Sequence, residues 1–89
     1  MAVRLDPDDP KACNNLGSVL AEEQKLDRAI VMFNRALSLD SVYTDALHNM
    51  GNAFIDSGKK DKGIVFLRRA ARLGHTEARR NLESMKLTW

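Results

Sequence analysis

Apolar residues recur along this chain at spacings of three and four, the period of amphipathic α-helices. Asp9 followed by Pro10 marks the first helix start, because Asp is a good N-cap and Pro is tolerated at the first helical position. Polar stretches at 22–25, 40–41 and 56–58 separate the later segments, so consecutive helices are expected to lie antiparallel. The pattern predicts an all-α fold.

The last segment is the least regular of the five. Gly74 is placed to cap the end of the fourth helix. Thr76 is expected to cap the start of a final helix over 76–89, with Ala78, Leu82, Met85 and Trp89 along its apolar face.

The pattern repeats at an offset of 34 residues. The identical pairs are Ala12/Ala46, Asn15/Asn49, Gly17/Gly51, Lys25/Lys59, Asp27/Asp61, Ile30/Ile64, Val31/Val65, Arg35/Arg69, Ala36/Ala70 and Leu39/Leu73. A helical unit of this length cannot bury its apolar stripe alone, so such units stack into an α-solenoid. Glycine inside a helix is unfavourable, so its recurrence at Gly17 and Gly51 indicates close helix packing, opposite the small residues Ala29 and Gly63.

These motifs resemble the tetratricopeptide repeat, whose signature places Leu-Gly in the first helix and Ala-x-x-x-Phe in the second. The first copy reads Cys13-x-x-Leu16-Gly17-x-x-Leu20 and Ala29-x-x-x-Phe33; the second reads Leu47-x-x-Met50-Gly51-x-x-Phe54 and Gly63-x-x-x-Leu67. The resemblance implies one domain over 1–89, with repeats at 9–41 and 42–75 and a capping helix at 76–89. The chain also departs from the signature, because Ser41 and His75 stand where the signature has its closing proline.

Residues 1–8 resemble the end of a second helix, since Ala2-Val3-Arg4-Leu5-Asp6-Pro7 matches the register of 36–41. We expect a remnant of a preceding repeat there, in either a fragment of a longer array or a protein with a truncated first unit. The first helix pair would then leave apolar surface uncovered, which favours self-association through the solenoid ends.

In this family the first helices of the repeats line a concave groove that binds an extended peptide or a helix. The resemblance therefore implies a protein-binding scaffold or adaptor rather than an enzyme. By position, the groove would contain Lys11, Asn14, Asn15, Ser18, Ala21, Glu22, Asp45, His48, Asn49, Asn52, Ile55 and Asp56. Asn15 and Asn49 recur one repeat apart, and a side-chain amide both donates and accepts, so the two could pair with a peptide backbone. Alternatively, they bond neighbouring helices and fix the angle between repeats.

The charge distribution leaves two further functions open. Residues 1–57 carry a net charge of −4 and residues 58–89 carry +6. This asymmetry suits an anionic partner, head-to-tail stacking or simply solvated helix faces. Nucleic acid is the alternative partner, through Lys59, Lys60, Lys62, Arg68, Arg69, Arg72, Arg79 and Arg80. The family's carboxylate clamp for chaperone tails is the other alternative, although Asn14 stands where that clamp has a lysine and Ser18 where it has an asparagine.

Catalytic and cofactor motifs are lacking. His48 lies near Asp45 and Asn52 without a second histidine close by in the sequence, so a groove histidine is favoured over a metal ligand. Cys13 falls on the apolar stripe and is expected in the core, and His75 is expected at a helix end. No apolar run is long enough to span a bilayer, and a single cysteine suits a reducing compartment. We therefore expect a cytoplasmic protein without cofactor or metal.

Overall fold

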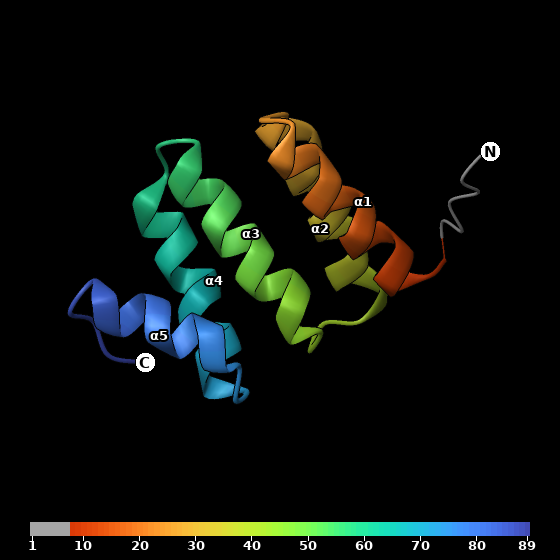
Figure 1. Cartoon of the computed structure of the whole chain (residues 1–89). Helices are drawn as coiled ribbons and strands as arrows, with labels where there is room; N and C mark the ends of the chain where they lie inside the picture. The colour runs from red at the N-terminus through yellow and green to blue at the C-terminus, as the bar shows by residue number, and fades with distance from the viewer. Residues whose placement is uncertain (1–7) are drawn as a thin grey trace.

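The computed structural model describes residues 8–89 and contains five α-helices and no strand over that range. The helices are α1 (Pro10–Glu22), α2 (Leu26–Leu39), α3 (Thr44–Asp56), α4 (Lys60–Arg72) and α5 (Thr76–Ser84). Figure 1 shows α1 beside α2 and α3 beside α4, with α5 across the end of the second pair. The predicted all-α solenoid of helix pairs is confirmed. The expected remnant at 1–8 lies, apart from Asp8, outside the described residues.

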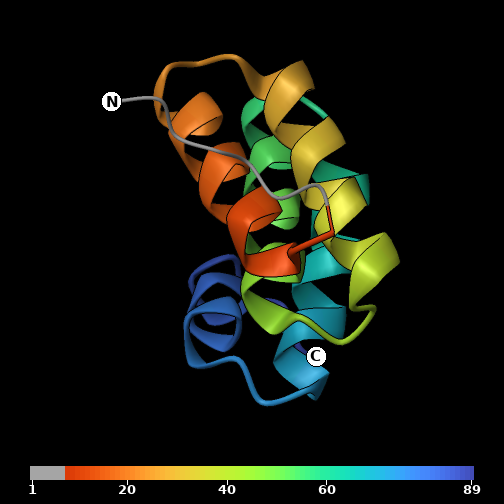
Figure 2. The ribbon, with the colours of Figure 1, turned by 90° about the vertical axis from the view of Figure 1, so that its right-hand side faces the viewer.

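The helices form two layers. Figure 2 shows α1 and α5 on one side of the molecule and α2 and α4 on the other. Helix α2 packs on α3 of the next pair, and α1 also contacts α3 directly. The first helices of successive units therefore form a continuous face, which we call the α1–α3–α5 face.

Two predicted helix boundaries are confirmed. Asp9 is the N-cap of α1, and its carboxylate accepts a hydrogen bond from the Lys11 N–H at 2.9 Å. Pro10 occupies the first turn, where its missing N–H has no helical partner. Gly74 follows the C-cap of α4 with φ of +98°, a left-handed conformation that glycine adopts without a side-chain clash.

The prediction for the last helix is wrong at both ends. The N-cap of α5 is His75 rather than Thr76, and the imidazole Nδ1 of His75 accepts the Ala78 N–H at 3.1 Å. The helix ends at Ser84 because Lys86 adopts φ of +59°, which a right-handed helix cannot continue. Trp89 consequently lies beyond the helix, with the Arg79 guanidinium 5.1 Å from its ring centroid.

The buried side chains form a core that runs through both pairs. Phe33 packs with Met50 and Phe54 between the first and second pairs, while Leu47, Leu67 and Leu82 pack between the second pair and α5. Cys13 is fully buried with Ala36 and Ala46, which confirms that it is a small core residue.

The predicted close packing is confirmed for Gly51 opposite Gly63, whereas the nearest neighbour of Gly17 is Phe33 rather than the expected Ala29. A Cβ on Gly63 would lie 2.5 Å from the Gly51 carbonyl oxygen, and a Cβ on Gly51 would lie 2.9 Å from the Gly63 carbonyl oxygen. A Cβ on Gly17 would meet the Phe33 ring at 2.5 Å. The backbones of α3 and α4 therefore approach each other too closely for any side chain at these two positions.

The face of α1 that corresponds to the buried face of α3 is partly uncovered. Val19 is 51% exposed, whereas Ala53, its equivalent one repeat later, is 2% exposed because α2 covers it. Leu16 is likewise half-buried where Met50 is 4% exposed. The first repeat therefore exposes apolar surface of the kind expected from the sequence.

Candidate functional site

A polar pocket of about 540 Å³ lies on the α1–α3–α5 face. Its walls come from α1, α3, the turn after α4 and the start of α5. Among the residues that line it are Asn14, Asp45, His48, Asn49, His75 and Glu77. Four predicted groove residues thus meet in one pocket, and the other two come from the turn and from α5.

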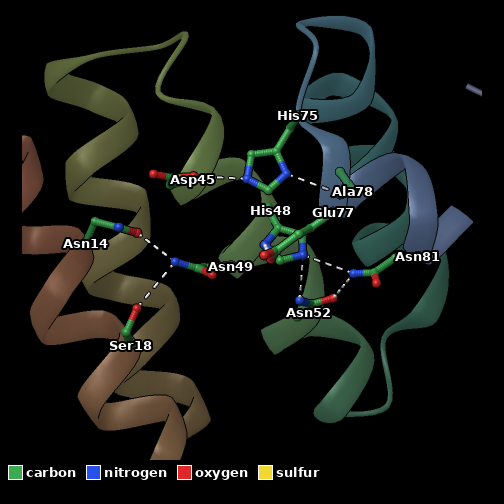
Figure 3. Close-up of polar contacts among 10 residues, drawn as sticks. All are labelled: Asn14, Ser18, Asp45, His48, Asn49, Asn52, His75, Glu77, Ala78 and Asn81. Carbon is green, nitrogen blue, oxygen red and sulfur yellow. Dashed lines mark hydrogen bonds and ion pairs between the residues drawn. The ribbon is translucent and has the colours of Figure 1, made fainter.

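Asn49 connects the first two repeats through side-chain hydrogen bonds. Its Nδ2 donates to Asn14 Oδ1 at 3.0 Å and to Ser18 Oγ at 3.3 Å, both on α1 (Figure 3). Asn14 is 6% exposed, so its amide needs such partners to be buried without a large desolvation cost. This pair of bonds fixes α3 against α1.

The same arrangement recurs one repeat later. Asn81 Nδ2 contacts His48 Nε2 at 3.0 Å and donates to Asn52 Oδ1 at 3.3 Å (Figure 3). His48 and Asn52 lie 34 residues after Asn14 and Ser18, and Asn81 corresponds to Asn49 once a two-residue deletion is allowed. The asparagines of α3 and α5 therefore each reach back to the preceding first helix.

Asn81, His75 and Glu77 were missed as site residues by the sequence analysis. The deletion before α5 hides the match of Asn81 to the repeated asparagine, although aligning Ala78 with Ala46 exposes it. His75 and Glu77 have no counterpart in the repeat signature. Only the packing of α5 across α3 brings them to the pocket.

Asn15 and Asn49, which the sequence groups together, have different surroundings. Asn15 is exposed on α1, where the chain has no preceding first helix within residues 8–89. Asn49 is half-buried, and its bonds to Asn14 and Ser18 use only Nδ2. Asn49 thus fixes the repeat angle, while its Oδ1 takes no part in either bond.

The hydrogen bonds around His48 define its neutral form. Both Asn52 Nδ2, at 3.1 Å, and Asn81 Nδ2, at 3.0 Å, approach the Nε2 of His48, and an amide nitrogen can only donate. Nε2 must therefore accept, which places the ring proton on Nδ1, 4.0 Å from Glu77 Oε2. Burial lowers the pKa of His48, and the neighbouring His75 lowers it further, against the opposing charges of Glu77 and Asp45.

His75 stacks on His48 with 4.6 Å between the ring centroids. Because its Nδ1 accepts the Ala78 N–H, its proton lies on Nε2, which donates to Asp45 Oδ1 at 2.9 Å. One imidazole therefore caps α5 and ties it to the first turn of α3. Each ring thus accepts at one nitrogen and has its other nitrogen beside a carboxylate.

The lowered pKa of His48 predicts a loss of stability in mild acid. An unfolded histidine takes up its proton near pH 6.5, whereas folded His48 resists protonation to a lower pH. In that window the unfolded state binds more protons, so the free energy of unfolding falls as the pH drops below about 6.5. His48→Asn removes this titration and retains an oxygen for Asn81, as Asn14 does for Asn49.

Urea denaturation at about pH 7.5 and about pH 5.5 measures the effect. We expect the wild-type midpoint to fall more between the two pH values than that of His48→Asn. Equal pH dependence of the two proteins would show that His48 does not carry the effect.

The other predicted groove residues lie outside the polar pocket. Lys11, Glu22 and Asp56 are exposed near helix ends. Ile55 packs against α4, since a Cβ on Gly63 would meet its Cγ1 at 2.5 Å, so helix packing accounts for this side chain.

Asn14 also reaches Tyr43, through a long hydrogen bond of 3.5 Å from its Nδ2 to the phenol oxygen. Burial raises the pKa of Tyr43, and the bond from Asn14 opposes that rise.

Two kinds of feature are absent from residues 8–89. No three His, Cys, Asp or Glu side chains there come close enough together to hold a metal ion. Within the same range no helix has the length and apolar character needed to cross a membrane.

Comparison with known proteins identifies the repeats. The tetratricopeptide repeat family model matches residues 10–43 and 44–73, and these ranges begin at the first residues of α1 and α3. A solved structure titled "Crystal structure of MamA" superposes with a TM-score of 0.76 at 28% identity, over 79% of this chain and 41% of that one. The chain thus spans less than half the length of MamA. No curated protein matches the chain.

Proposed function

Because this chain belongs to the tetratricopeptide repeat family, we propose that its α1–α3–α5 face binds an extended segment of a partner protein. Repeats of this family generally mediate protein–protein interaction, and their fold is typically a non-enzymatic scaffold. The observation that carries the proposal is the polar pocket of about 540 Å³, built from side chains of three first helices.

The pocket is suited to binding without catalysis. Its amide and imidazole groups are held by mutual hydrogen bonds, so a ligand meets a preorganised surface and little ordering entropy is lost on binding. Asn15 adds an exposed amide on the same helix as Asn14. An amide row of this kind can pair with the N–H and C=O groups of an extended backbone.

The proposal predicts different effects for the two repeated asparagines. Random 12-residue peptides displayed on phage are selected on the protein, resynthesised and measured by fluorescence anisotropy. Asn15→Ala is expected to lower the affinity for the selected peptides by about three- to tenfold, which corresponds to the loss of one hydrogen bond. The urea midpoint is expected to be unchanged. Asn49→Ala is expected to weaken binding and also to cost about 1–2 kcal/mol of stability, because it removes two bonds to α1.

Asn34→Ala is the matched control, since Asn34 is an exposed asparagine on α2, in the other layer. It is expected to change neither binding nor stability. Peptides whose affinity is unchanged by Asn15→Ala and Asn49→Ala would overturn the proposal.

Nucleic acid is the second candidate, and the basic residues give it limited support. Several of them are already engaged within the chain: Lys62 lies 5.8 Å from the Phe54 ring centroid, and Arg69 lies 5.5 Å from that of Phe66. The Arg79 Nε donates to the Ala71 carbonyl at 2.9 Å. Steeply salt-dependent binding of a random oligonucleotide would favour this candidate instead.

Two other interactions remain proposals of lower rank. A carboxylate clamp is poorly matched, because the polar pocket has Asn14 at the lysine position and carboxylates on its walls. Self-association through α1 is supported by the exposed side chain of Val19 on the uncovered face of the first repeat.

A further inference from the structure

We infer that the polar pocket selects a basic segment: the partner presents a lysine or arginine side chain between Asp45 of α3 and Glu77 of α5. This inference rests on the proposed function and names the chemistry of the segment bound there. It assigns to the pocket a charge preference opposite to that of a carboxylate clamp.

The charged groups of the pocket are both acidic. Asp45 and Glu77 line it, their side chains are 64% and 73% exposed, and among residues 8–89 no lysine or arginine lines it. Within residues 8–89 neither carboxylate forms an ion pair with a lysine or arginine; Asp45 Oδ1 lies 2.9 Å from His75 Nε2, and Glu77 Oε2 lies 4.0 Å from His48 Nδ1. A cation entering the pocket therefore does not have to displace an existing Lys or Arg pair.

The two histidines do not reverse this preference. His48 accepts amide N–H groups at Nε2, and His75 accepts the Ala78 N–H at Nδ1, so protonating either accepting nitrogen breaks bonds that hold α5. In this geometry each ring accepts a hydrogen bond at one nitrogen and has its other nitrogen beside a carboxylate. A neutral imidazole leaves the charge of the carboxylates in place.

Helix dipoles oppose the carboxylates but do not cancel them. The first turns of α3 and α5 both reach the pocket, and each helix N-terminus acts as about half a positive charge. Two such termini amount to about one positive charge against two full negative charges. A net negative potential of about one charge remains at the pocket.

The potential is local, because the whole chain carries a net charge of +2. A basic peptide is weakly repelled by the molecule as a whole, so its binding cannot come from overall attraction. The nine basic residues of 58–89 include Lys62 and Arg69, which contact aromatic rings away from the polar pocket. Selection of a basic segment would therefore not be explained by the net charge of the chain, and a control variant separates the pocket from acidic residues elsewhere in the chain.

The test uses the peptides selected from the random 12-residue library on the whole chain. We expect enrichment of Lys and Arg, and we expect Asp45→Asn/Glu77→Gln to weaken those peptides by about three- to tenfold, more at low salt than at high salt. The matched control is Asp27→Asn/Asp61→Asn, which removes the exposed first-turn acids of α2 and α4. It changes net charge and helix-dipole interactions equally, and it is expected to leave binding unchanged.

The outcomes separate this inference from the proposed function. One outcome is that the selected peptides lack basic residues, or carry acidic ones, and still bind more weakly to Asn15→Ala. That result would overturn the preference for a basic segment but would leave the proposed peptide-binding face supported. Basic peptides weakened equally by both double variants would also overturn it, because the effect would then be general charge. If no selected peptide responds to Asn15→Ala or Asn49→Ala, the proposed function fails and the inference fails with it.

Discussion

Phe33→Ala is expected to lower the free energy of unfolding by about 3–5 kcal/mol, because it removes a large side chain from the core. Phe33 is 1% exposed and packs with Met50 and Phe54 in the core that joins the two repeats. Its removal leaves a cavity between α2 and α3 that the neighbouring side chains can fill only in part. Each repeat buries its apolar stripe against its neighbour, so the substitution also weakens the packing between the two repeats.

The size of the effect matters because the protein is small. A chain of 89 residues is expected to have about 4–13 kcal/mol of total stability, so Phe33→Ala removes a large part of it. Urea denaturation followed by far-UV circular dichroism measures the loss. Val31→Ala is the control on the same helix, because Val31 is 65% exposed, and it is expected to change stability by less than about 0.5 kcal/mol. A loss below about 1 kcal/mol for Phe33→Ala would contradict the packing described here.

Gly63→Ala is expected to destabilise the protein by about 1–3 kcal/mol, although alanine is the better helix former by about 1 kcal/mol. The added Cβ would lie 2.5 Å from the Gly51 carbonyl oxygen, and a backbone atom cannot move away without shifting α3. The overpacking cost therefore exceeds the gain in helix propensity. Thermal unfolding of the variant and the wild type, analysed with the same baselines, shows directly whether the melting temperature falls or rises.

A second glycine provides a graded comparison. A Cβ on Gly17 would meet the side chain of Phe33, which can adjust more easily than a backbone carbonyl. Gly17→Ala is therefore expected to cost less than Gly63→Ala. If Gly63→Ala raised the melting temperature, propensity would dominate and the close approach of α3 and α4 would not limit stability.

Much of the fold follows from local pattern. Four features follow from residues whose preferences act within one helix pair. They are the N-cap at Asp9, the left-handed turn at Gly74, the close packing of α3 and α4 at their glycines, and the burial of Cys13. The errors lie at the end of the chain. There the imidazole of His75 replaces the expected hydroxyl cap, and the left-handed Lys86 ends the helix before Trp89.

The candidate site was only partly predictable. Asn14, Asp45, His48 and Asn49 were expected on one face, because a repeat period places equivalent residues on equivalent helices. The period could not show that Asn49 is bonded back to α1 whereas Asn15 is exposed. That difference depends on whether another first helix lies behind each asparagine.

The sequence by itself determined that this is a stack of antiparallel helix pairs of the tetratricopeptide repeat family, because period, glycine spacing and apolar stripes are local properties that recur. Tertiary structure alone decided which polar groups meet. It brought His75 and Glu77 of the last turn and helix to Asp45 and His48 of α3, and set which nitrogen of each imidazole accepts a hydrogen bond. The physical reason is that repeat periodicity fixes the packing of equivalent positions. The placement of the turn before α5, by contrast, depends on the contact between His75 and Asp45, two residues 30 apart whose pairing has no repeated counterpart.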